Sequence, residues 1–572
     1  MEQISTLEML PDEMILLICQ YFRDAEILYS FFNLNSRLNA TITDYCHYVN
    51  LMNVTHKQFD FVVTQIIPQI SLSIRSFVFN GLWENIMYNE LNSIFFHWKL
   101  SLMFPQLHTL SLVNFIDRQL NFFLDKITDL MQLVKLDIRN FRGERTEELL
   151  KKVLAANNNR LKSVLFDYDS IGFILNGTKH DEAVSYPNIE ELIVNLETDK
   201  MLEYLFILAP HINRLHIDFD QLSSTSKSTL ANISSLVHLK DFQLRSININ
   251  WSLDEITYIL NKMPSLQRLA LDLCTEDEDL VNGQNFSSIL PSSLVEIHFF
   301  IIYYFSRLHS EVITLMSTWP THIRITCLLD ESNAYTVIHT IPCDLPSIII
   351  PAKISKCMLA GSEYTRKVKD LTIFDEQCST DIHQIVQHFH RLRTLTIGSK
   401  NNLEILTFQS TQPIILHLPY LTHLNVKGVC EIFRLVQAAP NLEYLRINLN
   451  CLNIALNDVS TCELLQKRIV DLEITHIQEV DSIQLDVVAQ KFNHLRDFSL
   501  SLKNPKIFVD SLILQMILLW KEKNLRSLYI NGSLTDEVSK NLRQWLISHS
   551  HLRQEDSFTV KYENNWIVLW LL

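Results

Sequence analysis

A nine-residue pattern with apolar residues at positions 1, 4 and 6 recurs along most of the chain and constrains its fold more than any other feature. The segment MPSLQRLAL, for example, supplies Leu266, Leu269 and Leu271. The first apolar residue of successive copies is Ile74, Leu107, Leu133, Leu161, Ile189, Ile212, Leu239, Leu266, Leu294, Val368, Leu392, Leu421, Leu442, Ile469, Leu495 and Leu525. Most copies are 21 to 30 residues apart, but the gap is 33 residues after Ile74 and 74 residues after Leu294.

This spacing predicts a strand and a helix in each unit. Positions 4 and 6 alternate with polar positions 3, 5 and 7, which is typical of a half-buried strand. Stretches between the strands, such as 312–317 and 430–438, place apolar residues three and four apart, as helices do. A unit of about 27 residues cannot bury its own apolar face, whereas stacked units bury the faces of their neighbours. We therefore expect an α/β fold with a parallel sheet lined on one side by helices.

The long gap after Leu294 predicts an irregular region over residues 300–367 with about two degenerate units. Candidate strands there are Ile323–Leu329 and Ile348–Ile350, and the aromatic run Phe299–Phe305 is interpreted as a buried strand. At the end of the chain, FTVKYENNWIVLWLL predicts a hairpin that turns at Glu563–Asn565. We expect this hairpin, within residues 557–572, to cap the last strand of the sheet.

These units resemble leucine-rich repeats of the helix-containing type. The resemblance implies a solenoid over residues 74–556, with the parallel sheet on its concave face and the helices on its convex face. The asparagine or cysteine ladder of such repeats is mostly missing, and only Cys274 and Asn450 fall near its position. An ordinary α/β domain with many LxxLxL strands is the alternative.

The segment before the repeats has a different character. Leu10-Pro11-Asp12-Glu13 opens a helix, because proline suits the first helical position and carboxylates favour the positive end of the helix dipole. A second short helix is expected near residues 24–32, and a third begins near Asn35 or Ser36, either of which can cap it. Three helices in about 40 residues make a small core that is only marginally stable alone.

LPDEMILLICQYFRDAEILYSFFNLNSRLNATI resembles the F-box motif, although Leu38 stands where the family usually has tryptophan. The resemblance covers residues 5–48, and residues 49–73 connect it to the repeats. It implies docking onto the Skp-type adaptor, and through it the cullin, of an SCF ubiquitin ligase. Carried over by position, the adaptor-binding residues are Leu10, Pro11, Ile15, Ile18 and Leu28. The alternative is that these residues pack only on the first repeats.

Composition narrows the classes of partner. A net charge of −15 disfavours nucleic-acid binding, because an acidic chain repels phosphate backbones. None of the ten cysteines forms a CxxC pair, and their scatter at apolar positions is typical of a reduced compartment. The acidic start predicts no signal peptide, and no apolar stretch approaches the length of a membrane span. We expect a cytoplasmic or nuclear protein that does not bind membranes.

No catalytic motif is present, so we expect no enzyme and no cofactor. The sequence lacks GxGxxG, GxxxxGK[ST], HExxH and GxSxG. His383, His388 and His390 are offset by five and seven residues, which spreads their rings around a helix and argues against a metal site. A hidden active site would have to be a buried polar cluster on the concave face.

Strand positions 3, 5 and 7 are expected to form the surface that binds a target protein. Arginine and aspartate alternate there between neighbouring units, and tyrosines join them later in the chain. Since arginine and tyrosine are enriched among binding hot spots, the candidate target-binding residues are Arg214, Arg245, Arg268, Tyr444, Arg446 and Tyr529. The alternative is a self-satisfied ladder of ion pairs that only solvates the face.

Together these features predict a substrate-recognition subunit of an SCF-type ubiquitin ligase that has no catalytic residues of its own. The alternative function is a leucine-rich-repeat scaffold that binds a partner without ubiquitin transfer. The identity of the target protein does not follow from the sequence.

Overall fold

The structure is a computed structural model that describes residues 10–19, 24–52, 54, 56–81, 100–141, 146–167, 170, 172–174, 185–198, 201–221, 235–304, 309–329, 335–352, 367–375, 385–399, 405–406, 416–427, 429–430, 432–477, 482–521, 525–553, 558–563 and 565–571. The chain is a mixed α/β protein that divides into two compact units, Met1–Ile297 and His298–Leu572, and the division falls within a single strand. Among the described residues no helix is long and apolar enough to cross a membrane.

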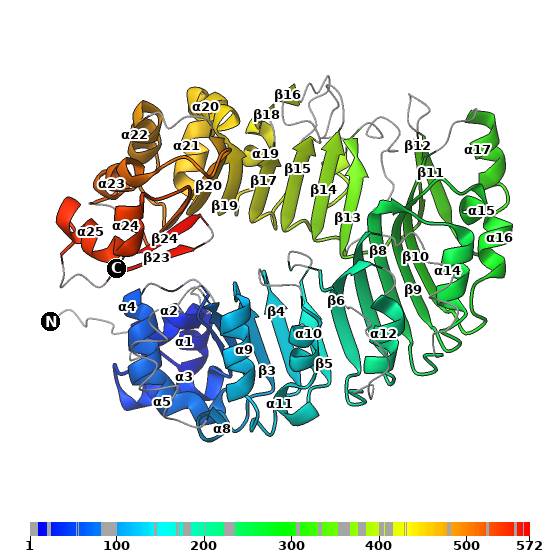
Figure 1. Ribbon diagram of the computed structural model, residues 1–572, viewed down its shortest axis with the longest axis horizontal. Coiled ribbons are helices and arrows are strands. Elements are labelled where there is room, and N and C mark those ends of the chain that lie inside the picture. Colours follow the sequence, from blue (N-terminus) through cyan, green and yellow to red (C-terminus); the bar gives the residue numbers. More distant parts are fainter. Residues whose placement is uncertain are drawn as a thin grey trace. The chain divides into compact units, whose positions relative to one another are not determined.

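A 12-stranded sheet begins in the first unit, with strands in the order β1 to β10 followed by β12 and β11 (Figure 1). Its strands are β1 (Tyr48–Asn50), β2 (Ser76–Asn80), β3 (Thr109–Val113), β4 (Lys135–Arg139), β5 (Ser163–Phe166), β6 (Glu191–Thr198), β7 (Arg214–Gln221), β8 (Asp241–Asn250), β9 (Arg268–Thr275), β10 (Glu296–Tyr304), β11 (Ile325–Leu329) and β12 (Tyr335–Thr340). From β1 to β9 each strand pairs in parallel with the next.

The second unit contains a separate 10-stranded sheet in the order β13-β14-β15-β17-β19-β20-β21-β22-β24-β23. Its strands are β13 (Ser347–Pro351), β14 (Asp370–Asp375), β15 (Thr394–Ser399), β17 (His423–Lys427), β19 (Tyr444–Asn448), β20 (Asp471–Ile477), β21 (Asp497–Leu502), β22 (Ser527–Asn531), β23 (Thr559–Glu563) and β24 (Trp566–Trp570). Strands β16 (Ile405–Leu406) and β18 (Val429–Cys430) form a small parallel pair.

The nine-residue pattern predicted the strands closely. Each of the sixteen predicted first apolar residues stands two positions before the first residue of a strand: β2 to β10, β14, β15, β17 and β19 to β22. Fifteen of these sixteen residues are buried, and Leu294 is only partly so. Positions 4 and 6 also enter the core, as Leu269 and Leu271 do. The apolar pattern therefore determines both where a strand begins and which of its faces is covered.

The later helices of the first unit run along one face of its sheet, and its first helices lie at the start of the sheet (Figure 1). They are α1 (Asp12–Cys19), α2 (Asp24–Phe31), α3 (Ser36–Tyr45), α4 (His56–Phe61), a π-helical turn (Val62–Ile66), α5 (Ile67–Ile70), a 3-10 turn (Ser71–Ser73), α8 (Leu100–Met103), α9 (Asp117–Lys126), α10 (Glu147–Leu154), α11 (Ala156–Asn159), α12 (Met201–Leu208), α14 (Leu253–Leu260), α15 (Glu278–Val281) and α16 (Gly283–Ser288). Helix α10 is typical: Leu149, Leu150, Val153 and Leu154 are buried, and the Thr146 hydroxyl accepts the Leu149 N–H at 3.3 Å.

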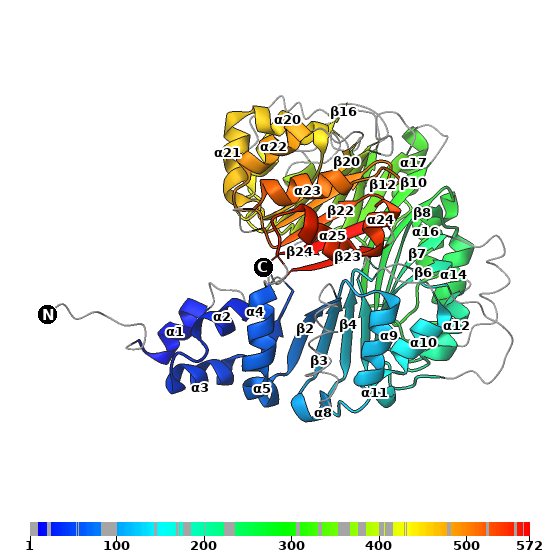
Figure 2. The same cartoon turned by 60° about the vertical axis from the view of Figure 1, so that its left-hand side comes forward.

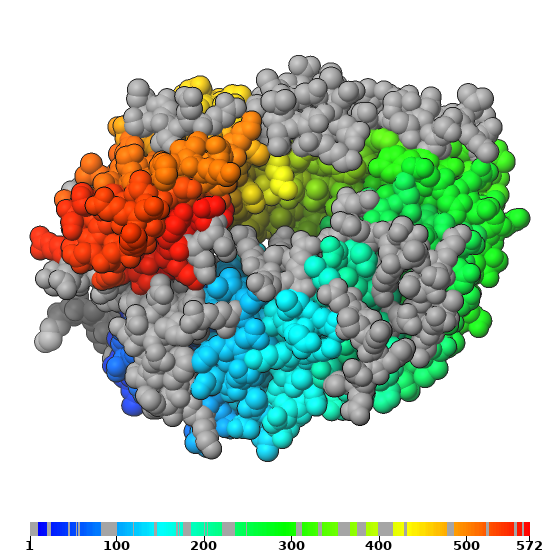
Figure 3. Space-filling view, in the orientation of Figure 1, coloured from blue at the N-terminus to red at the C-terminus, as the bar shows by residue number. Residues whose placement is uncertain are grey.

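The helices of the second unit are α17 (His309–Met316), α19 (Phe433–Ala438), α20 (Leu449–Asn457), α21 (Val459–Arg468), α22 (Ser482–Lys491), α23 (Asp510–Leu519), α24 (Asp536–Lys540) and α25 (Leu542–His549). Helices α17 and α19 coincide with two of the helical stretches that the sequence predicted. Figure 3 draws the atoms in the same orientation and shows the blue to cyan residues of the first unit as one closely packed surface.

The start of the first sheet contains an asparagine ladder that the sequence analysis missed. The Asn114 side chain donates to Asn80 Oδ1 at 3.1 Å, and Asn140 donates in turn to Asn114 Oδ1. Asn114 and Asn140 have φ of 58° and 50°, a left-handed conformation that asparagine tolerates better than most residues. Asn114 and Asn140 stand one position later in their repeats than Asn80 does in its own. The ladder therefore has no constant position in the nine-residue pattern. Farther along, Cys274 Sγ donates to the carbonyls of Ile247 and Ile249, both at 3.0 Å.

Gly81 follows the first member of this ladder in a place with no room for a side chain. A Cβ atom there would lie 2.8 Å from each of three atoms, Asn114 O, Gln119 Oε1 and Phe115 Cδ2. Gln119 in turn donates to Gly81 O at 2.8 Å and accepts from Ile116 N at 2.9 Å, so it cannot move without loss. We expect Gly81→Ala to lower the free energy of unfolding by about 1–3 kcal/mol, measured by urea denaturation.

Gly398 supplies the matched control. A Cβ at that position would meet the Lys427 side chain at an ordinary 3.8 Å. Gly398→Ala should therefore change the urea midpoint little, within about 0.5 kcal/mol. Equal shifts in the two variants would show that crowding at Gly81 is not the cause.

The region 294–368 corrects two expectations. Strand β12, which the sequence analysis missed, pairs in antiparallel fashion with both β10 and β11. Of the two expected degenerate units, Ile323–Leu329 is thus part of an antiparallel hairpin, and only Ile348–Ile350, within β13, pairs in parallel, with β14. The expectation of one continuous sheet is also wrong, because the strands form two large sheets. The run from Phe299 does form a buried strand, β10, up to Tyr304; Phe305 lies outside the described residues.

The second sheet ends in the antiparallel hairpin that the sequence predicted. Strand β24 pairs with β22 and β23, and Glu563 stands opposite Trp566. Ile567 and Leu569 are buried, which explains why the chain ends in so apolar a segment. Asn565 adopts a φ of 61° at the turn.

Candidate recognition surfaces

Helices α1 to α3 lie beside α4 and α5 near β1 and β2 (Figure 2). The predicted cap of α3 is confirmed: Asn35 Oδ1 accepts from Leu38 N at 2.8 Å. Helix α2 contacts α4 and β1, and the rings of Tyr29 and Phe61 meet edge to face with centroids 5.3 Å apart. Helix α2 thus packs against the start of the first unit.

The structure changes the face that these helices can offer to a partner. Ile15 and Leu28, two of the five predicted adaptor-binding residues, are buried in the core of the module. Pro11 is exposed, and Leu10 and Ile18 are partly exposed. The exposed apolar side chains of α1 are instead Met14 and Leu17, with 46% and 50% of their surface in contact with solvent. Ile15 and Leu28 therefore point inward and offer no exposed apolar surface for the predicted contact.

The exposed and partly exposed apolar residues form one stripe along α1, which we call the α1 stripe: Leu10, Pro11, Met14, Leu17 and Ile18. Met14 lies three or four residues from each of the other four, and such positions share a helix face. Hydrogen bonds from Arg37 hold the start of the stripe in place. Its guanidinium donates to Asp12 Oδ1 at 2.6 and 2.9 Å and to Leu10 O at 2.7 Å. Arg37 is part of the sequence motif, but the motif does not predict these contacts.

The face of the first sheet that lies away from the helices contains two rows of charged and polar residues. The first polar row is Glu191, Arg214, Asp241 and Arg268, which stand opposite one another on β6 to β9. Arg214 Nη1 lies 2.9 Å from Glu191 Oε1, and Arg268 Nη1 lies 3.1 Å from Asp241 Oδ1. Two of the predicted target-binding arginines, Arg214 and Arg268, therefore bind neighbouring carboxylates within the sheet.

Asp241 is the best-neutralised carboxylate in that row. It lies 3.3 Å from Arg214 Nε as well as 3.1 Å from Arg268 Nη1. Burial opposes its ionisation, but His216 and the charges of Arg268 and Arg214 outweigh burial and hold the pKa of Asp241 below its ordinary value. The first polar row thus fits the alternative of a ladder of internal ion pairs, each worth at most about 1 kcal/mol where it is exposed.

The second polar row is Asn195, Asp218, Arg245 and Asp272, again opposite one another on β6 to β9. Arg245 Nε lies 3.9 Å from Asp218 Oδ2 and 3.8 Å from Asp272 Oδ2, beyond hydrogen-bonding distance. Asp272 is completely buried, with 1% of its surface exposed. Burial, opposed by Arg245 and reinforced by Asp218, raises the pKa of Asp272 to about 7.

The second sheet contains the other three predicted target-binding residues. Tyr444 Oη donates to Glu473 Oε2 at 2.8 Å, and Arg446 Nε lies 3.2 Å from Glu473 Oε1. Burial, with the negative charge of Glu473, raises the pKa of the Tyr444 hydroxyl. The third residue, Tyr529, stands opposite Ser499 on β21, and burial likewise raises its pKa. The structure thus brings Tyr444 and Arg446 together around one carboxylate.

Two aspartates share the same face of the second sheet. Asp471 and Asp497 stand directly opposite each other on β20 and β21. Asp497 accepts from Arg526 Nε at 3.0 Å and from the Ser527 hydroxyl. Burial and then the charge of Asp497 raise the pKa of Asp471 well above its ordinary value of 3.8. Sequence analysis did not single out this pair, although two aspartates at strand position 3 of consecutive repeats would have revealed it.

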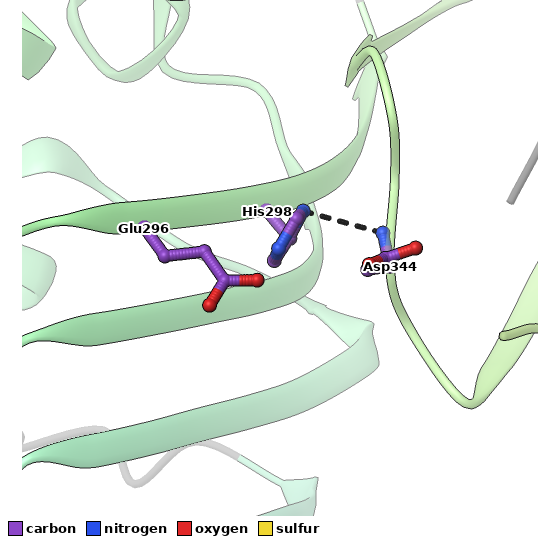
Figure 4. Close-up of side chains that lie close together, drawn as sticks. All are labelled: Glu296, His298 and Asp344. Atoms are coloured by element: carbon purple, nitrogen blue, oxygen red, sulfur yellow. Dashed lines mark hydrogen bonds between the residues drawn. The ribbon is translucent and has the colours of Figure 1, made fainter.

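Three side chains of metal-ligand type, Glu296, His298 and Asp344, lie close together (Figure 4). His298 Nδ1 accepts from the Asp344 backbone N–H at 3.2 Å, and Asp344 Oδ2 lies 2.6 Å from Lys367 Nζ. Glu296 pairs with Arg268 at 3.6 Å. Both carboxylates are therefore already paired with cations, Glu296 with Arg268 and Asp344 with Lys367. We interpret the cluster as two ion pairs and a hydrogen bond. Of the histidines that the sequence analysis considered, His388 is buried, His390 is exposed and His383 lies outside the described residues.

Comparison with known proteins provides no family assignment. No family model matches the chain, and a search of curated proteins finds no match.

Proposed function

We propose that the chain is a substrate-recognition subunit of an SCF-type ubiquitin ligase, in which α1 to α3 dock onto the Skp-type adaptor and the repeats hold a target protein. The repeats would form a leucine-rich-repeat solenoid whose polar sheet faces meet the target. The observation that carries the proposal is the α1 stripe, an apolar surface at the front of a long array of strand–helix units. Such an exposed stripe is expected where a second protein binds.

The resemblance of residues 5–48 to the F-box supports this choice of partner. Burial of a half-exposed Met14 or Leu17 by the adaptor would contribute about 1 kcal/mol each. In this function the chain supplies no bond-making residue. It would raise the local concentration of a target near the transfer enzyme, so the rate gain comes from proximity.

The test is capture of a purified Skp-type adaptor by the full chain. Met14→Asp combined with Leu17→Asp should weaken capture more than tenfold, because two carboxylates would have to lose water in an apolar interface. Both side chains are half exposed, so the substitutions should leave the fold intact.

The matched control is Leu72→Asp combined with Leu102→Asp, which adds the same charge at residues 61% and 74% exposed outside the stripe. This variant should bind the adaptor as the unaltered chain does. Equal capture by both double variants would refute the stripe as the docking surface. If the unaltered chain captures no adaptor or cullin but its repeats still bind a partner, the chain is a repeat scaffold without ubiquitin transfer.

A further inference from the structure

The second polar row differs from the first in how its carboxylates are satisfied. In the first row, guanidinium nitrogens approach the carboxylates of Glu191 and Asp241 to 2.9 and 3.1 Å. In the second row, the single arginine stands opposite both aspartates and approaches neither closer than 3.8 Å. Asp272, unlike Asp241, therefore has no guanidinium nitrogen within hydrogen-bonding distance.

Asp272 is the residue whose bonding is incomplete. Neither of its carboxylate oxygens has a hydrogen-bond partner, and 1% of the residue is exposed. Asn195, at the other end of the row, is 6% exposed and uses its Nδ2 on the carbonyls of Asp167 and Ser170. Its Oδ1 is also without a partner. The three unsatisfied atoms of the two residues are all acceptors, so a group that completes the bonding of either residue must be a donor.

A buried carboxylate without hydrogen bonds is costly, and it is usually relieved by a proton or by a cation. A proton supplies one donor and leaves the second oxygen unsatisfied. A guanidinium or ammonium group supplies at least two N–H donors and the missing positive charge. The two oxygens of Asp272 therefore lack hydrogen-bond donors that a cationic side chain would supply.

The two residues in the middle of the row are partly exposed. The side chains of Asp218 and Arg245 keep 24% and 13% of their surface exposed. A cationic group that enters beside Asp218 would first meet one carboxylate and then, next to Arg245, reach the second. Since the side chains of β7, β8 and β9 alternate between faces, these residues all lie on the face away from the helices.

We propose that the second polar row binds a basic side chain, an arginine or a lysine, of the target protein. This inference rests on the proposed function, because it specifies the chemistry of the target that the repeats would hold. It makes Asp272 and Asp218 the specificity residues of the first sheet. The first polar row would be structural, since its arginines and carboxylates already bind one another.

The test uses the full chain and two peptides, acetyl-Gly-Gly-Arg-Gly-Gly-amide and the same peptide with citrulline in place of arginine. Citrulline has nearly the shape of arginine but no charge. Titration calorimetry at pH 6 in two buffers of different ionisation enthalpy measures both affinity and protons released. We expect the arginine peptide to bind at least tenfold more tightly and to release close to one proton, because the cation displaces the proton held by Asp272.

Asp272→Asn should abolish the proton release and weaken binding at least fivefold. Asp137→Asn is the matched control, since Asp137 lies on the same face in β4 and is paired with Arg139 at 2.5 Å. Equal affinity for both peptides, absence of binding, or binding without proton release by the unaltered chain would overturn the proposal, and these outcomes do not depend on any variant folding. Adaptor capture tests the proposed function separately, so the two can fail independently.

Discussion

Replacement of Asp272 by asparagine is expected to stabilise the chain at pH 8 and to leave its stability at pH 4 nearly unchanged. In the folded chain the pKa of Asp272 is about 7, whereas the ordinary value is 3.8. Between these values the folded state retains a proton that the unfolded state has lost, so stability falls as pH rises from about 4 to about 7. A raised pKa of this size corresponds to about 4 kcal/mol. Asparagine does not titrate, so the variant should not lose stability as the pH rises through this range.

The measurement is urea unfolding of both proteins at intervals from pH 4 to pH 8. The Asp272→Asn curve should lose the decline that the unaltered chain shows across this window. The control is Asp241→Asn, in the first polar row, for which the expected change in stability at pH 8 has the opposite sign. The pKa of Asp241 is lowered, so its ionised form stabilises the fold above pH 4, and its replacement should destabilise the chain at pH 8. Parallel pH profiles for Asp272→Asn and the unaltered chain would contradict the prediction.

Asn157→Ala is expected to lower the free energy of unfolding by about 3–5 kcal/mol. Asn157 is completely buried, and its Nδ2 donates to Leu130 O at 2.7 Å and to Leu133 O at 2.9 Å. Alanine would leave both carbonyls without this donor. It would also occupy a backbone position with φ of 54°, which costs a residue with a Cβ about 1–2 kcal/mol. The urea midpoint at neutral pH measures the combined effect.

Two further variants separate these causes. Asn157→Gly removes the hydrogen bonds but relieves the backbone, so its loss should be smaller than that of alanine. Asn158→Ala changes a neighbour with the same φ of 54° whose donated bond, to Thr128 O at 2.7 Å, is exposed. We expect it to cost less than about 2 kcal/mol, because water can replace an exposed hydrogen bond. A larger loss for Asn158→Ala than for Asn157→Ala would rule out burial as the source of the effect.

Sequence periodicity predicted the strands well because each strand must bury the same two positions against its neighbours. Leu269 and Leu271 of β9 show this: both are completely buried, and the alternating Arg268 and Asp272 lie on the other face. The same logic failed for β12. Its residues Tyr335 to Thr340 are all buried on both faces, so they show no alternation. A short strand of this kind acquires its place from its antiparallel partners, which periodicity does not indicate.

The candidate sites were predictable only in part. Sequence position placed Arg214, Arg245 and Arg268 on the polar face, but it could not distinguish a satisfied carboxylate such as Asp241 from an unsatisfied one such as Asp272. That distinction depends on burial and on a small difference in distance, since the nearest guanidinium nitrogen lies 3.1 Å from Asp241 and 3.8 Å from Asp272. Similarly, Ile15 and Met14 are adjacent apolar residues of α1, and only the packing of α1 decides which one faces inward.

The hairpin of β23 and β24 has a consequence for self-association. A parallel sheet that ended at β22 would present a row of unpaired backbone N–H and C=O groups, onto which a strand of another molecule could add. Strand β24 pairs with those groups instead. Because β24 runs antiparallel to β22, another parallel repeat cannot continue the sheet in the same register. A chain shortened before Thr559 would lose this protection, and its last strand would become a template for polymerisation.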